Sequence, residues 1–150
     1  MKLFLLPLLF LTACQFHPLF GDKTMEGVCV SPISEYSGYQ LYQALTQHFP
    51  DQENCSYALV VQPITTTLSD QSISDKDFTT MQRVQASAAY KLLNQEKEVL
   101  ISNTAMASGS SAVVINPYST VVSLDKTTQN LIPLLADQIA SHVAAYLDRK

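Results

Sequence analysis

The sequence predicts an α+β domain in which two helices pack on one face of a four-stranded mixed sheet, in the order β-α-β-β-β-α. Residues 79–93 and 99–107 alternate apolar and polar side chains around a short polar turn, which indicates two long antiparallel strands. Residues 34–49 and 130–147 carry apolar side chains at helical spacing. Two short β-type runs, 27–33 and 55–64, flank the first of these helices.

The other elements follow from local patterns. Proline ends the first strand at Pro32 and the first helix at Pro50, and residues 55–64 are apolar on both alternating sets, as in a central strand. Residues 65–77 are mostly Ser, Thr and Asp, which predicts a solvated, mobile loop. The turn lies at 94–97, and the returning strand is expected to end in the Ser- and Gly-rich residues 108–111. The last helix either begins near Asn130, with Pro133 in its first turn, or begins earlier and is kinked at Pro133.

This arrangement leaves one face of the sheet without helices. We expect that face to be polar and largely uncovered, bearing Arg83, Gln85, Ser87, Lys91, Ser102, Thr104 and Met106.

The chain begins with a leader typical of exported proteins. Lys2 precedes an apolar run, residues 3–11, and Leu11-Thr12-Ala13-Cys14 closes it. Small residues before a cysteine form the lipobox of bacterial lipoproteins, in which the thiol carries diacylglycerol and the new N-terminus carries an acyl chain such as palmitate. An uncleaved membrane anchor is the alternative, but the apolar run is well short of the roughly 20 residues that cross a bilayer. We therefore expect a signal peptide at 1–13, lipidation of Cys14, a tether at 14–26 and one domain at 27–150.

The composition argues against several classes of function. Nine Lys and Arg face 13 Asp and Glu, and the charges are scattered, so we expect no nucleic-acid partner. Charged residues make up 15% of the chain, against about 25% in typical soluble domains. This low fraction indicates a surface that a partner covers; a small, neutral, Ser/Thr-rich soluble domain is the alternative.

The cysteines predict a disulfide. With Cys14 acylated, Cys29 and Cys55 remain as a pair in an oxidising compartment, with no metal-binding or redox motif around them. Each lies near the start of a predicted strand, and a strand–helix–strand order places the two strands parallel and adjacent. We therefore expect Cys29 and Cys55 to be bonded, with two buried free thiols as the alternative, and we expect no metal and no cofactor.

No residue pattern indicates an enzyme. The histidines are His17, in the tether, His48, and His142, on a helix that mostly packs. Residues 109–111 lack the Gly-x-Ser-x-Gly pattern of a nucleophile elbow. Asp75 and Asp77 lie in the predicted loop, where catalytic positioning is poor. We expect no catalytic residues.

The residues after the lipobox resemble a known family. Gln15-Phe16-His17-Pro18-Leu19-Phe20-Gly21 is similar to the start of the LPS-assembly lipoprotein LptE of alphaproteobacteria, although the family usually has Gly and Tyr where this chain has Gln15 and Phe20. Weaker similarities follow in the same order, at 57–61, at Arg83 with 89–92, at 116–119 and at 135–147. The resemblance spans the whole mature chain and implies the same order of elements.

The resemblance implies an outer-membrane lipoprotein, on the periplasmic side, that plugs the LptD β-barrel, helps it to assemble and assists lipopolysaccharide transport to the outer leaflet. Gln15, in place of Asp after the acylated cysteine, is compatible with sorting to that membrane. Lipopolysaccharide carries phosphates and carboxylates, so Arg83, Lys91 and Lys97 are the candidate contacts; ordinary solvated basic side chains are the alternative. A lipid-anchored scaffold or a lipid carrier of another envelope-assembly complex is the alternative function. A carrier would need a large apolar cavity between helices and sheet.

Overall fold

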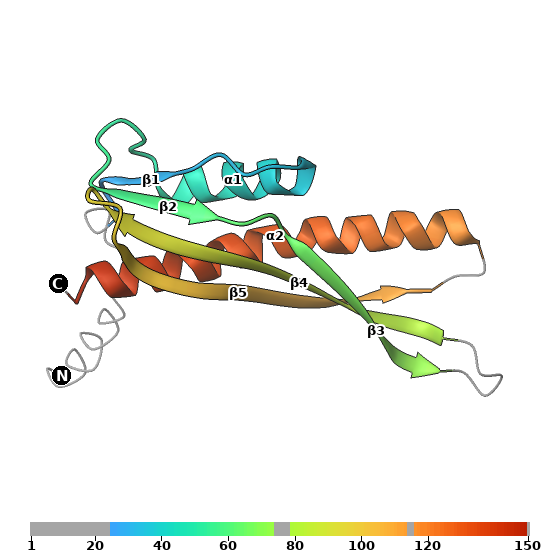
Figure 1. Ribbon diagram of the computed structural model, residues 1–150. Helices are drawn as coiled ribbons and strands as arrows, with labels where there is room; N and C mark the ends of the chain where they lie inside the picture. Colours follow the sequence, from blue (N-terminus) through green and yellow to red (C-terminus); the bar gives the residue numbers. More distant parts are fainter. Residues whose placement is uncertain (1–24, 74–78, 114–115, 150) are drawn as a thin grey trace, which may run out of the picture.

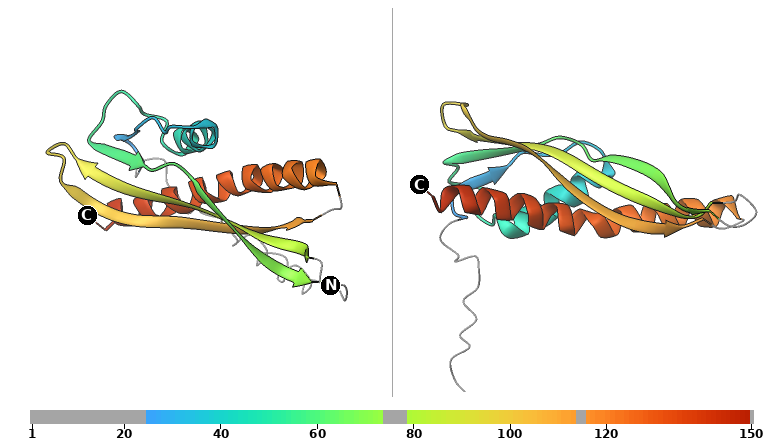
Figure 2. Two further views of the ribbon diagram at one scale, coloured as in Figure 1. Left: turned by 45° about the vertical axis from the view of Figure 1, so that its right-hand side comes forward. Right: turned by 90° about the horizontal axis from the view of Figure 1, so that it is seen from below.

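The computed structural model describes residues 25–73, 79–113 and 116–149 (Figure 1). The expected signal peptide, Cys14 and most of the tether lie outside these residues. The elements are β1 (Val28–Val30), α1 (Tyr36–His48), β2 (Tyr57–Val61), β3 (Thr65–Ile73), β4 (Thr79–Asn94), β5 (Val99–Ala112) and α2 (Pro117–Leu147). The predicted α+β class is confirmed, with both helices on one face of a mixed sheet (Figure 2).

The sheet is organised around β4. Along one edge β4 pairs antiparallel with β5, and along the other it pairs first with β2 and then with β3. β1 pairs parallel with β2 at the outside, as the strand–helix–strand order predicts. The register shifts by one residue between Val61, opposite Tyr90, and Thr65, opposite Ser87. Pro63 lies between them and has no N–H to donate, which accounts for the interruption.

Two expectations about strands were wrong. Residues 65–73 form β3 instead of a loop, so the sheet has five strands rather than four, and residues 74–77 of the expected loop lie outside the described part. β5 continues through residues 108–111 to Ala112 instead of ending there. Both segments pair with β4 through the backbone, and those hydrogen bonds do not require apolar side chains.

The core lies between the sheet and the helices. Alternate residues of β4 are fully or almost fully buried, and they are Val84, Ala86, Ala88, Tyr90 and Leu92. Helix α1 adds Leu41 and Leu45, followed by Phe49, and α2 adds a stripe that includes Leu131, Leu135, Ile139 and Val143. A fully buried side chain of this size contributes about 1.5–3 kcal/mol. The alternation and the helical spacing read from the sequence therefore mark the side chains that hold the layers together.

Helix α2 is one 31-residue helix that contains Pro133, so the second of the two expected starts applies. Its N-terminus is defined by Asn116, whose side-chain Oδ1 accepts a hydrogen bond from the Tyr118 N–H at 3.0 Å, and by Pro117 in the first turn. Within the described residues, no helix has both the length and the apolar character that a membrane span requires.

Candidate functional surface

The face of the sheet opposite the helices is polar and open, as the alternation predicts. Arg83, Lys91, Ser102, Thr104 and Met106 are exposed there, and Gln85 and Ser87 are half-buried. The long strands β4 and β5 present this face along their whole length (Figure 1). A broad polar surface with few charges is therefore built into the most regular part of the fold.

The three basic candidates do not form one cluster. Arg83 and Lys91 lie on the same face of β4 but eight positions apart, which corresponds to about 27 Å along a strand. Lys97 lies in the turn between β4 and β5, where its backbone adopts φ 64°. Lys91 and Lys97 are thus at one end of the sheet, whereas Arg83 is closer to the other end.

Strand β3 forms an exposed surface, where the sequence pattern predicted a loop. Every residue from 65 to 71 is exposed, on both faces of the strand, and Leu68 is 47% exposed. Among the described residues, its neighbour in the sheet is β4 alone. The β-branched run Thr65-Thr66-Thr67 was the available signal, because threonine favours strands, but the segment has no buried face to produce alternation.

The outer edge of β1 is closed by a glutamine. Gln52 accepts a hydrogen bond from the Val30 N–H at 2.9 Å and donates one to the Val28 carbonyl at 3.3 Å, so its amide replaces a neighbouring strand. The expected disulfide between Cys29 and Cys55 is present beside it, with a Cα–Cα distance of 5.4 Å. It ties the loop that carries Gln52 to β1.

The outer edge of β5 is closed in its middle by two further amide side chains. The Met106 N–H donates to Oε1 of Gln138 on α2 at 2.8 Å. The Thr104 N–H donates to Oδ1 of the adjacent Asn103, also at 2.8 Å. Backbone donors of an edge strand that are occupied in this way cannot recruit another strand.

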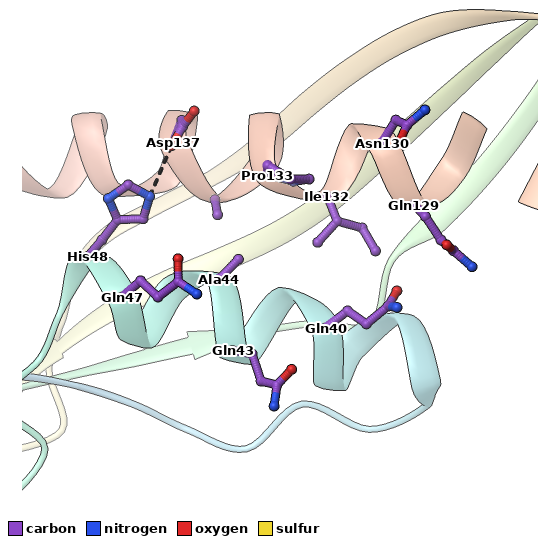
Figure 3. Close-up of a pocket in the computed structure, with 11 residues that line it drawn as sticks. Gln40, Gln43, Ala44, Gln47, His48, Gln129, Asn130, Ile132, Pro133 and Asp137 are labelled. Carbon is purple, nitrogen blue, oxygen red and sulfur yellow. Dashed lines mark ion pairs between the residues drawn. The ribbon is translucent and has the colours of Figure 1, made fainter. Parts of the chain in front are cut away.

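A groove of about 600 Å³ runs between α1 and α2 (Figure 3). Its lining combines apolar residues with five amide side chains, which are Gln40, Gln43, Gln47, Gln129 and Asn130. At one end His48 and Asp137 form an ion pair, with 2.9 Å between Nε2 and Oδ1. The space between the helices is therefore a surface groove with a mixed polar and apolar lining.

His142 takes part in a contact that its position in the sequence did not reveal. It is exposed, and its Nδ1 lies 2.7 Å from the hydroxyl of Tyr90, which is buried in the core. Burial raises the pKa of Tyr90, and a hydrogen bond with Asn103 lowers it by a smaller amount. The other residues considered for catalysis, His17, Asp75 and Asp77, lie outside the described residues.

Comparison with known proteins relates this fold to lipoproteins. No protein-family model matches the chain. A protein of Rickettsia prowazekii, the uncharacterized protein RP188, is 26% identical over 146 residues, which cover 93% of this chain and 92% of that one.

The solved structures that resemble this one are more distant in sequence. A candidate lipoprotein from Caulobacter crescentus CB15 has a TM-score of 0.64 at 14% identity, over 86% of this chain and 96% of that chain. The rare lipoprotein B of Shewanella oneidensis has a TM-score of 0.62 at 10% identity, over 80% and 93%. An uncharacterized lipoprotein B of Nitrosomonas europaea has a TM-score of 0.59 at 11% identity, over 87% and 94%. The chain therefore shares its fold with proteins described as bacterial lipoproteins.

Proposed function

We propose that this chain is an outer-membrane lipoprotein that plugs an LptD-type β-barrel, helps the barrel to assemble and assists lipopolysaccharide transport, without catalysis. The observation that carries the proposal is the polar, sparsely charged sheet face that the helices leave open. The lumen of a large barrel is lined with polar side chains, which a Ser-, Thr- and Gln-rich surface can satisfy through hydrogen bonds. The shared fold with lipoproteins and the lipobox at Cys14 support the same reading.

The packing favours a plug over a lipid carrier. A carrier requires an apolar cavity that holds acyl chains, whereas here the apolar residues between sheet and helices pack against one another. The groove between α1 and α2 lies at the surface, and its lining includes five amide side chains, which are poor partners for acyl chains. The alternative role as a lipid-anchored scaffold of another complex requires no cavity, and the experiment below separates it from the plug.

The length of the tether limits how far from the membrane the domain can lie. Ten residues, 15–24, lie between Cys14 and Met25, so the chain from one to the other reaches at most about 40 Å. β1 begins at the end of the sheet that also holds the β4–β5 turn and the end of α2 (Figure 1). The anchor therefore attaches to the domain at the end that carries Lys91 and Lys97, and it raises the concentration of the domain near any partner at the membrane.

The first test is purification of the tagged protein from native outer membranes in mild detergent. We expect one large, heat-modifiable β-barrel to copurify at equal stoichiometry, and photo-crosslinks from positions 91 and 104 to reach it. A Cys14→Ala variant, which cannot be lipidated, serves as the control for anchoring. Recovery of the protein alone contradicts the plug, and recovery with a different complex favours the scaffold.

The lipopolysaccharide contact is tested separately by charge reversal. Lys91→Glu combined with Lys97→Glu removes two positive charges close to the proposed membrane side, and we expect weaker binding of purified lipopolysaccharide. Lys126→Glu is the control for the single variants Lys91→Glu and Lys97→Glu, because each variant reverses one charge and residue 126 lies on α2 away from that end. Equal losses in the three single variants would show that general electrostatics, and not a defined contact, governs binding.

A further inference from the structure

One hydrogen bond shows to which side of each strand the backbone N–H and C=O groups point. Met106 lies opposite Ser87, and the Met106 N–H points away from β4 toward Gln138. The backbone groups of Ser87 therefore face the other neighbour, β3, where Ser87 lies opposite Thr65. The backbone groups of successive residues in a strand point alternately to opposite sides. Because the groups of Thr65 point toward β4, those of the next residue, and of every second residue after it, point away from the sheet. In β3 these outward positions are Thr66, Leu68 and Asp70.

This edge differs from the other two edges of the same sheet. Gln52 occupies the outward backbone groups of β1, and Gln138 and Asn103 occupy those in the middle of β5. Among the described residues, no side chain closes the outer edge of residues 65–71. An exposed edge strand is a template for another strand, and proteins ordinarily block it. In the described part of the chain, side chains block the edge of β1 and the middle of the edge of β5, and the edge of β3 stays open.

We propose that the outer edge of β3 accepts an extended strand from another polypeptide chain. Backbone donors and acceptors that recur along a strand edge are matched in full by another strand. The threonine run favours this geometry, and Asp70 is the one charged residue between 65 and 73. Leu68 offers an apolar side chain against which a partner side chain packs. The partner is therefore an extended segment of low charge with an apolar residue opposite Leu68.

The exposure of β3 argues for a different protein as the partner. If β3 paired with β3 of a second copy, the edge would be covered, but both faces of residues 65–71 would stay exposed. A strand that belongs to a larger surface covers the edge and one of these faces together. The proposal does not depend on that surface being a barrel.

Leu68→Pro tests the edge with little disturbance to the fold. Proline removes the outward N–H of residue 68 but no hydrogen bond to β4, and edge strands tolerate proline at such positions. Leu68→Thr keeps the N–H and alters only the side chain. Ser102→Pro is the matched control, because residue 102 also points outward, on β5. Thermal unfolding of each purified variant verifies that the domain is folded.

The readout is photo-crosslinking in cells from a benzoylphenylalanine at position 66, with the adduct mapped by mass spectrometry. We expect one contiguous segment of one partner, and at least about a tenfold lower yield with Leu68→Pro but not with Leu68→Thr or Ser102→Pro. No adduct, a yield that Leu68→Pro does not lower, or an adduct to a second copy overturns the proposal. A Pro-sensitive adduct to a protein other than a barrel supports the strand addition and contradicts the plug.

Hydrogen exchange supplies a measurement that needs no variant. In the purified mature protein the amides of Thr66, Leu68 and Asp70 are expected to exchange fast, because water reaches them. In the membrane-bound protein we expect at least a tenfold slower exchange at these three amides. Equal rates in the two preparations overturn the proposal, even if Leu68→Pro fails to fold.

Discussion

The hydroxyl of Tyr90 lies 2.7 Å from Nδ1 of His142, and this contact joins the buried face of β4 to the last turns of α2. Burial raises the pKa of Tyr90 above 10.0, so the folded protein favours the neutral phenol. This contribution to stability is fully present below the unfolded-state pKa near 10.0 and is lost as the pH rises through the higher folded-state value. The burial of Tyr90 therefore predicts an alkaline limit to stability.

Tyr90→Phe should weaken the loss of stability at alkaline pH. We expect it to lower the free energy of unfolding by about 1 kcal/mol near neutral pH, because His142 loses its partner, and to flatten the fall in stability above about pH 10. Urea unfolding across this range measures both effects. Tyr36→Phe, at an exposed position, controls for the number of tyrosines. A slope unchanged by Tyr90→Phe would contradict the assignment.

Loss of the disulfide should destabilise the domain substantially. The bond between Cys29 and Cys55 spans 26 residues, for which the chain-entropy model predicts about 3.5 kcal/mol. We expect the double variant Cys29→Ser/Cys55→Ser to unfold at a correspondingly lower urea concentration. The wild-type protein under reducing conditions should match it. If oxidised and reduced wild type unfold together, the bond contributes nothing to stability.

Gly38→Ala should destabilise the protein, contrary to the usual effect in a helix. Alanine is ordinarily preferred to glycine in a helix interior by about 1 kcal/mol. Here a Cβ at residue 38 would lie 2.6 Å from Cγ2 of Ile33, so the Ile33 side chain or the loop that carries it must move. We expect a net loss of about 1–3 kcal/mol in chemical denaturation. A double-mutant cycle with Ile33→Ala should show that the two changes partly compensate, and additive losses would place the cause elsewhere.

Gln138 should stabilise the edge of β5 through its acceptor oxygen. Gln138→Leu leaves the Met106 N–H without its protein partner, and we expect about 1 kcal/mol less stability together with greater self-association of the purified domain. Gln138→Glu keeps an acceptor at the same place and should retain most of the effect. Sedimentation velocity measures the self-association, and urea unfolding measures the stability. If the two variants have the same stability and self-association, the Met106 N–H has another hydrogen-bond acceptor.

The elements that bury one face could be read from the sequence. In β4, apolar residues from Val84 to Leu92 alternate with polar ones because one side meets the helices and the other meets water. The helix 36–48 and the parallel pair that places Cys29 near Cys55 follow from the same kind of pattern. Of the candidate surface, the polar face of β4 and β5 was predictable on these grounds.

The wrong predictions concern residues whose burial leaves no periodic pattern in the sequence. Residues 65–71 are exposed on both faces of β3, so their side chains carry no periodic signal, and only the backbone pairing with β4 makes them a strand. Ser111 reads as a loop residue, yet it is buried, and its hydroxyl lies 3.0 Å from that of Ser123 on α2. The closing of sheet edges by Gln52 and Gln138 depends on side chains that meet backbone distant in sequence.

The sequence by itself determined the α+β class, the order of helices and strands that have a buried face, and the pairing of two cysteines, because hydrophobic periodicity and chain order are local properties. The tertiary structure decided that β3 exists, that α2 runs through Pro133 as one helix, and that side chains close the edge of β1 and the middle of the edge of β5. Each of these depends on contacts between distant segments, whose free energy overrides local preference.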